Sequence, residues 1–71
     1  MSFGVALAKV MERRGLSELD LRVRLVKKRR PKSAGTVESW LRGYRTPDFE
    51  TLRVLADVLE CSVDELMGRA G

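Results

Sequence analysis

The chain has 71 residues, with 14 Lys and Arg against 10 Asp and Glu, one Cys and no His. This length supports a single hydrophobic core, and one Cys excludes an internal disulfide framework. Without His or a second Cys there is no zinc-binding set, and no apolar run approaches the roughly 18 residues of a membrane span. We therefore expect one domain over residues 1–71 in a reducing cytoplasm, associated with the nucleoid, with no metal, cofactor or membrane contact.

The first part of the chain predicts two helices. Apolar residues recur at helical spacing from Phe3 to Arg14, with Ser2 available as N-cap and Gly15 as the C-terminal stop. Ser17 then opens a second segment, because Ser-Glu-Leu-Asp is a helix-start pattern in which the serine oxygen accepts a backbone N–H of the first turn.

The second segment fits two kinds of secondary structure. Apolar and polar residues alternate from Leu19 to Leu25, which is typical of a half-buried strand. On a helical wheel Leu19, Val23 and Val26 form one apolar stripe and Leu21 with Leu25 another, as expected of a helix packed on two sides. A helix is favoured, because a lone strand would have no partner elsewhere in the chain.

The middle of the chain predicts a break followed by a third helix. Basic residues continue the second segment up to Pro31, which ends it because the ring removes an N–H and disfavours helical geometry in the preceding residue. Ser33 can cap a helix from Ala34 to Arg42, and Gly43 stops it. We expect Trp40 on this helix to be a core residue.

Two further helices complete the prediction. Thr46-Pro47 begins a fourth helix, with proline in the first turn and an apolar stripe that includes Phe49 and Leu59. Ser62-Val63-Asp64-Glu65 is a capping box for a short fifth helix, which Gly68 ends. The sequence therefore predicts an all-α protein, a bundle of five helices.

Positive charge is concentrated in the middle of the chain. Nine of the Lys and Arg residues lie between Arg22 and Arg45, a window whose only acid is Glu38. The window carries about +8 (nine bases less one acid) and the rest about −4 (five bases less nine acids). Such an asymmetric distribution concentrates a polyanion, of which nucleic acid is the leading candidate. A solvated surface and an acidic protein partner remain the alternatives.

The C-terminal half contains a known pattern, which runs from Trp40 through the Arg42-Gly43-Tyr44-Arg45-Thr46-Pro47 linker to the capping box at Ser62. It resembles the phage-repressor helix-turn-helix family, also called Cro/CI or XRE-type. In that family a recognition helix ends in an apolar residue and a Gly, followed by a basic linker, a Pro-led fourth helix and a Ser-capped fifth. Gly15-Leu16-Ser17 is similar to the family's entry into helix two.

The resemblance implies a lambda-repressor-like fold in which the helix after Ser33 enters the major groove of double-stranded DNA. The residues placed at base edges are Ala34, Gly35, Thr36 and Ser39. With the basic residues before the recognition helix included, the expected phosphate contacts are Ser17, Lys27, Lys28, Arg29, Arg30, Lys32, Ser33, Arg42, Tyr44 and Arg45. No base-facing residue provides a bidentate fork, and Ser33 and Thr36 could serve only to start the helix.

The chain departs from the family pattern before the recognition helix. About five extra residues lengthen the turn, and they are basic, from Lys27 to Lys32. They could lengthen helix two toward the DNA backbone, reach along a groove, or form a flexible solvated loop. A second alignment puts the insertion before Leu25-Val26, but it leaves Arg29 where the family buries a leucine and so ranks second.

Two other departures concern charge. Met11 and Leu41 stand where the family often has a buried Arg–Glu pair, and replacing both partners by apolar residues keeps the core consistent. Glu18 stands where relatives often have a Gln that contacts the backbone, and Arg22 replaces a small buried alanine. Glu18 would repel phosphate.

We therefore expect a sequence-preferring DNA-binding regulator of transcription, with repression as the preferred action. A weak homodimer formed on DNA is expected, with contacts from Val63, Leu66, Met67 and their neighbours. The alternative is a protein-interaction module of the same fold that binds an acidic partner, such as a polymerase subunit or a toxin. No clustered Ser, Lys and carboxylate arrangement supports an enzyme. The sequence alone does not identify the operator, the regulated gene or the sign of regulation.

Overall fold

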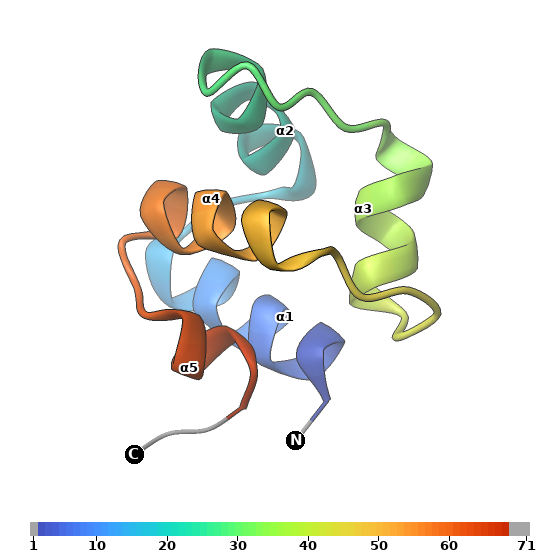
Figure 1. Cartoon of the computed structure of the whole chain (residues 1–71), viewed down its shortest axis with the longest axis vertical. Coiled ribbons are helices and arrows are strands. Elements are labelled where there is room, and N and C mark those ends of the chain that lie inside the picture. Colours follow the sequence, from blue (N-terminus) through green and yellow to red (C-terminus); the bar gives the residue numbers. More distant parts are fainter. Residues whose placement is uncertain (1, 69–71) are drawn as a thin grey trace.

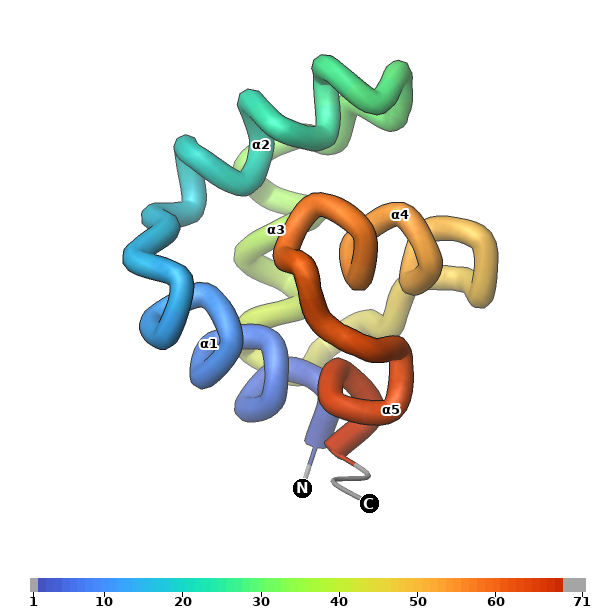
Figure 2. The backbone as a smooth tube through the Cα atoms, turned by 90° about the vertical axis from the view of Figure 1, so that its left-hand side faces the viewer, coloured from blue at the N-terminus to red at the C-terminus, as the bar shows by residue number. Residues whose placement is uncertain are grey.

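Five helices are present in residues 2–68, the part of the chain that the computed structural model describes (Figure 1). They are α1 (Phe3–Arg14), α2 (Glu18–Lys27), α3 (Ala34–Leu41), α4 (Phe49–Leu59) and α5 (Val63–Leu66). The α1 helix packs against α3, α4 and α5, and α2 packs against α3 and α4. In both views α2 and α5 lie at opposite ends of the molecule (Figures 1 and 2). The all-α prediction is confirmed, and the strand alternative for the second segment is excluded.

Leucine is the most frequent residue of the core, which also contains one aromatic pair. Leu7, Leu25 and Leu55 are fully buried, each on a different helix. Trp40 is also buried, as predicted, and its ring meets Phe3 edge-on, with the centroids 6.4 Å apart and the ring planes at 84°. Such an edge-to-face pair adds about 0.5–1.5 kcal/mol to the free energy of burying the two rings. It fixes α3 against the first turn of α1.

Each helix begins at a serine or aspartate whose side chain accepts a backbone N–H three residues later, and these caps are Ser2, Ser17, Ser33, Asp48 and Ser62. The cap at Ser17 is a complete box, because Asp20 also accepts from the Ser17 N–H. At Ser62 only the serine half of the predicted box forms, since the Glu65 carboxylate accepts from Arg13.

The predicted boundaries of α3 and α4 need small corrections. Because Asp48 caps α4 by accepting from the Thr51 N–H at 3.0 Å, the helix begins at Phe49 and Pro47 lies outside it. The α3 helix ends at Leu41, with Arg42 as its C-cap.

Each of the first four helices is followed by a residue in the left-handed conformation, and the N–H groups of this residue and of the next one bond to carbonyls of the last helical turn. These residues are Gly15 (φ 67°), Arg29 (φ 61°), Gly43 (φ 81°) and Glu60 (φ 54°). Glycine takes this conformation freely, whereas a residue with a Cβ is strained by about 1 kcal/mol. The chain therefore keeps two charged residues at positions that favour glycine.

The end of α2 was predicted wrongly. The expected boundary was Pro31, but the helix stops at Lys27, because the Arg29 N–H bonds the Val26 carbonyl and the Arg30 N–H bonds the Leu25 carbonyl, both at 2.9 Å. These two bonds close the helix in the Schellman arrangement. Residues 28–33 are therefore a loop that connects α2 to α3.

The prediction that α2 packs on two sides was also wrong. Leu21 and Leu25 are fully buried, whereas Leu19, Val23 and Val26 are exposed by 58%, 47% and 59%. The cause is the position of α2 at one end of the molecule, where among the described helices only α3 and α4 contact it (Figure 2).

The structure also corrects the predicted positions of two other apolar residues, Phe49 and Leu66. Phe49 was placed in the inward stripe of α4, but it begins the helix and is 66% exposed. Leu66 was named as a dimer contact, but it is fully buried within the core and offers no surface to another molecule. Met11 is buried and Leu41 packs against the core, which is consistent with their paired apolar replacement.

Gly4 sets the distance between α1 and α3, and this contact can be tested. A Cβ at Gly4 would lie 2.5 Å from the Trp40 carbonyl oxygen and 2.7 Å from that of Leu41. Because backbone atoms cannot turn aside, Gly4→Ala should lower the free energy of unfolding by about 2 kcal/mol, measured by urea denaturation. In the control Gly35→Ala the new Cβ would lie 3.9 Å from Ser33 Oγ. This variant should be as stable as the parent or more so, and equal losses in both would contradict the packing account.

The Asp48 cap predicts that the stability of the folded protein depends on pH. Hydrogen bonding with Thr51 holds the pKa of Asp48 below its ordinary value, and the nearby Lys32 and Arg30 act in the same direction. A lowered pKa in the folded state means that the stabilisation is complete above the unfolded pKa, near 4, and is lost as pH falls through the folded value. Asn caps a helix as well as Asp. Asp48→Asn should therefore change stability little at pH 7 and flatten the loss of stability below about pH 4, measured by urea denaturation.

If Asp48→Asn lost stability below about pH 4 as steeply as the parent, Asp48 would not be a source of the pH dependence. Part of the slope should remain, because the pKa values of Asp20 and Glu65 are also lowered, through hydrogen bonds with Ser17 and Arg13 respectively.

Candidate functional site

The N-terminal half of α3 presents small and hydroxylated side chains to solvent. Ser33 Oγ accepts from the Thr36 N–H at 3.2 Å and lies 3.0 Å from Thr36 Oγ1, so one of the two hydroxyls donates to the other. Ser39 Oγ donates to the Gly35 carbonyl at 2.9 Å. One hydroxyl hydrogen of the Ser33–Thr36 pair stays free, and Ser39 keeps only acceptor capacity. Ala34 and Gly35 are exposed beside them.

A shallow hollow of about 230 Å³ continues this surface toward the end of α3, and Gly35, Glu38, Ser39, Arg42 and Tyr44 line it. Arg42 Nη2 lies 2.8 Å from Glu38 Oε1, and both side chains are more than half exposed. Tyr44 is 75% exposed. The left-handed Gly43 turns the chain here, so that Arg42, Tyr44 and Arg45 surround the end of the helix.

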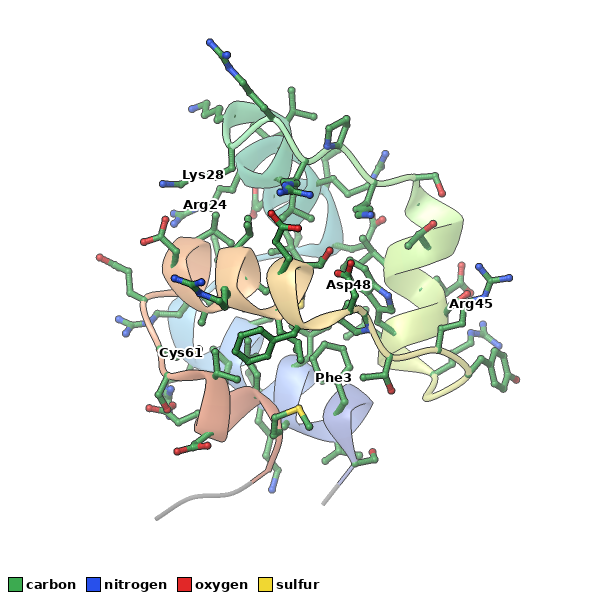
Figure 3. All side chains as sticks on the ribbon, viewed as in Figure 1. Phe3, Arg24, Lys28, Arg45, Asp48 and Cys61 are labelled. Carbon is green, nitrogen blue, oxygen red and sulfur yellow. The ribbon has the colours of Figure 1, made fainter. Side chains whose placement is uncertain are left out.

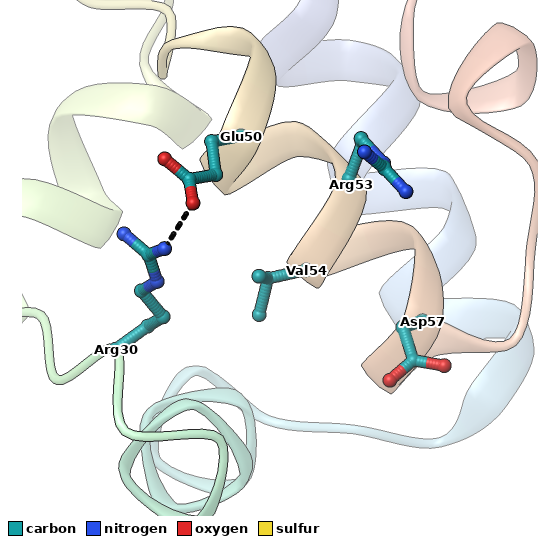
Figure 4. A pocket seen from close by; sticks show the side chains of 5 residues that line it. All are labelled: Arg30, Glu50, Arg53, Val54 and Asp57. Atoms are coloured by element: carbon teal, nitrogen blue, oxygen red, sulfur yellow. Dashed lines mark hydrogen bonds and ion pairs between the residues drawn. The ribbon is translucent and has the colours of Figure 1, made fainter.

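Two basic residues of the loop before α3 contact α4 instead of extending into solvent. Lys28 Nζ lies 2.6 Å from Asp57 Oδ2, and Arg30 bonds Glu50 (Figure 4). Arg24 of α2 also donates to the Val58 carbonyl at 3.0 Å. Figure 3 shows Arg24 and Lys28 on the α2–α4 side of the molecule and Arg45 on the opposite side, beside α3. The open question about Lys27 to Lys32 is thereby answered, because residues 28–32 form a loop tied to α4.

The ion pairs between the loop and α4 are weak and can be exchanged. All four side chains are at least 40% exposed, and pairs of this kind contribute about 0–1 kcal/mol. Three of them, Arg30, Glu50 and Asp57, line a hollow of about 420 Å³ together with Arg53 and Val54 (Figure 4). Another anion could take Lys28 or Arg30 from its partner at small cost.

Four basic residues of the expected set form no ion pair or side-chain hydrogen bond within residues 2–68, and they are Lys27, Arg29, Lys32 and Arg45. Lys32 is half-buried and the other three are exposed. The Ser17 hydroxyl oxygen accepts from the Asp20 N–H within the cap of α2. The structure thus places exposed cations both before α3 and after it.

Glu18 has a partner that the sequence analysis missed. Glu18 Oε1 and Arg22 Nε lie 2.8 Å apart, shielded from solvent and without hydrogen-bond alignment. The spacing of four residues on one helix was a sufficient signal, because such residues lie on the same helical face. The repulsion expected between Glu18 and an approaching anion is therefore reduced by Arg22. The same spacing relates Glu38 to Arg42.

Comparison with known proteins gives one match. The model of the helix-turn-helix family matches residues 7–66, which contain part of α1 and all of the other four helices. No curated protein and no solved structure matches the chain. None of the helices described in residues 2–68 is long and apolar enough to cross a membrane.

Proposed function

Because the chain belongs to the Cro/CI-type helix-turn-helix family, a family of DNA-binding domains, we propose that it is a sequence-preferring regulator of transcription that acts as a repressor. The observation that carries the proposal is the exposed N-terminal half of α3, with unpaired cations before and after it. In the proposed complex α3 lies in the major groove, and α2 crosses the DNA backbone. Occupying an operator would block polymerase.

The base contacts proposed are Ala34, Gly35, Thr36 and Ser39, each with a limited chemistry. Thr36 can donate or accept, depending on which hydroxyl of the Ser33–Thr36 pair keeps its hydrogen. Ser39 accepts only, which suits adenine N6 or cytosine N4. The Ala34 methyl suits a thymine methyl, and Gly35 lets the backbone come close. Without a bidentate contact, which is worth about 1–3 kcal/mol, the preference among sequences should be modest.

The phosphate contacts proposed fall into three groups. Unpaired cations can bind phosphate directly, and these are Lys27, Arg29, Lys32 and Arg45. Paired cations must first exchange a carboxylate for a phosphate, and these are Lys28, Arg30 and Arg42. Hydroxyl groups can add neutral contacts, and these are Ser17, Ser33 and Tyr44. Such contacts provide affinity and register without sequence information.

We also propose that the protein forms a weak homodimer on DNA. Val63 and Met67 are half-buried, and Phe49 adds an exposed aromatic ring on α4. Leu66 is excluded from the interface by its burial. A few apolar side chains are far below the 20–30 residues per partner of a standard stable interface, so DNA must provide the rest of the binding free energy.

The experiment that tests the function is selection of bound duplexes from a random pool near physiological salt. The enriched duplex and a scrambled control are then titrated at several salt concentrations. An enriched motif, together with a fall of log K with log salt of about 0.9 per phosphate contact, supports the proposal. Absence of enrichment with weak, uniform binding would overturn it.

Thr36→Ala tests base reading. If Thr36 contacts a base, the substitution should reduce the ratio of affinities for the selected and scrambled duplexes by up to about tenfold, at unchanged stability. In the matched variant Arg45→Ala, both affinities should fall by the same factor, and the salt slope should decrease by about 0.9. Equal losses on both duplexes in Thr36→Ala would remove Thr36 from the set of base contacts.

Arg29→Gly separates stability from binding. Glycine relieves the left-handed backbone at this position, so the variant should be about 1 kcal/mol more stable. It should also bind every duplex more weakly, with a salt slope smaller by about 0.9, because one phosphate contact is lost. Fluorescence anisotropy and urea denaturation measure the two effects.

Glu60→Gly is the matched control, since Glu60 has the same strained conformation at the end of α4. It should gain similar stability without loss of affinity. If Arg29→Gly also keeps its affinity, Arg29 is not a phosphate contact.

A further inference from the structure

The exposed apolar side chains of α2 form a continuous stripe. Leu19, Val23 and Val26 are 58%, 47% and 59% exposed, and spacings of four and three residues place them on one face of the helix. Over seven residues the stripe is about 10 Å long. Val5, Tyr44 and Phe49 are the other large apolar residues well exposed in residues 2–68, and they lie on other segments. We call Leu19, Val23 and Val26 the α2 stripe.

Neither the core nor DNA binding accounts for the α2 stripe. The helix is already held to α3 and α4 through Leu21 and Leu25, which are fully buried. Figure 2 shows α2 along the outer edge of the fold. Aliphatic side chains gain nothing from phosphates, which are bound by cations and hydroxyls. A contiguous apolar surface on a small protein is typical of an interaction site.

The charges around the α2 stripe indicate the chemistry of its partner. Residues 18–29 contain two acids and five bases. Both acids are engaged, since Glu18 pairs with Arg22 and Asp20 bonds to Ser17 in the cap. The exposed cations Lys27 and Arg29 at the C-terminal end of the stripe have no partner within residues 2–68. The complementary surface is therefore apolar with acidic residues at its edge.

We infer that the α2 stripe docks an amphipathic helix of an acidic partner protein. Side chains spaced as Leu19, Val23 and Val26 match the way in which one helix packs along another through positions i, i+4 and i+7. A second copy of the chain that packed its own α2 stripe there fits less well, because both acids of that helix are already engaged, Glu18 with Arg22 and Asp20 in the cap. The α2 stripe lies on a different helix from the proposed base contacts of α3, and the inference shares only Lys27 and Arg29 with the proposed phosphate contacts.

The probe for this surface is a synthetic peptide of about 16 residues, with Leu at one helical face and Glu beside it. Its scrambled isomer has the same composition but no apolar face. Each is titrated into the isotopically labelled full chain and followed by NMR. We expect the amphipathic peptide to shift the signals of Leu19, Val23 and Val26, and the scrambled isomer to shift none of them.

Two serine substitutions make a matched pair, because Val23 and Val5 are 47% and 48% exposed, on α2 and α1 respectively. Val23→Ser should weaken peptide binding about fivefold, and Val5→Ser should leave it unchanged. Both variants should keep the parent's affinity for DNA. Leu19→Ser provides a second variant if circular dichroism shows that Val23→Ser does not fold.

Several results would overturn the inference. Equal binding of the scrambled isomer, no binding of either peptide, shifts outside α2, or equal weakening by Val5→Ser and Val23→Ser would each do so. A dimer in sedimentation equilibrium that Val23→Ser abolishes would assign the α2 stripe to a second copy instead. Binding to vesicles of anionic phospholipid that depends on Val23, without binding of the peptide, would assign it to a lipid surface.

Discussion

The contact between α1 and the end of α3 is the constraint on which the rest of the site depends. An isolated helix of eight residues is not stable in water, so α3 holds its shape only through packing. Gly4 allows the carbonyl groups of Trp40 and Leu41 to come close, and the Trp40 ring meets Phe3 in the same place. This contact anchors the C-terminal end of α3. The exposed residues of its N-terminal half, Ala34 and Gly35, are thereby held in place for an external ligand.

The sequence predicted the features that depend on near neighbours in the chain. Ser17 and Ser33 were correctly identified as caps, because a hydroxyl followed by three helix-forming residues satisfies a local hydrogen-bonding requirement. Trp40 was correctly placed in the core. The partnership of Glu18 with Arg22 was also local and could have been found from its spacing.

Local sequence patterns did not predict the features that depend on where a helix lies in the folded protein. Helical periodicity marks Leu19 and Leu21 as equally apolar, and only the placement of α2 at one end of the molecule makes the first exposed and the second buried. The end of α2 was missed because Arg29 adopts a backbone conformation that usually calls for glycine, so Pro31 seemed the nearest stop signal. For the candidate site, the sequence identified the basic residues but not that Lys28 and Arg30 contact acids of α4.

The attachment of the loop to α4 has a consequence for the charge on the surface of α4. If Lys28 and Arg30 exchange their carboxylate partners for phosphates, Asp57 and Glu50 lose their compensating charges. The surface of α4 would then become more acidic whenever DNA is bound. A molecule that contacts α4 without touching the DNA would then respond to DNA binding through the changed electrostatic potential of this surface.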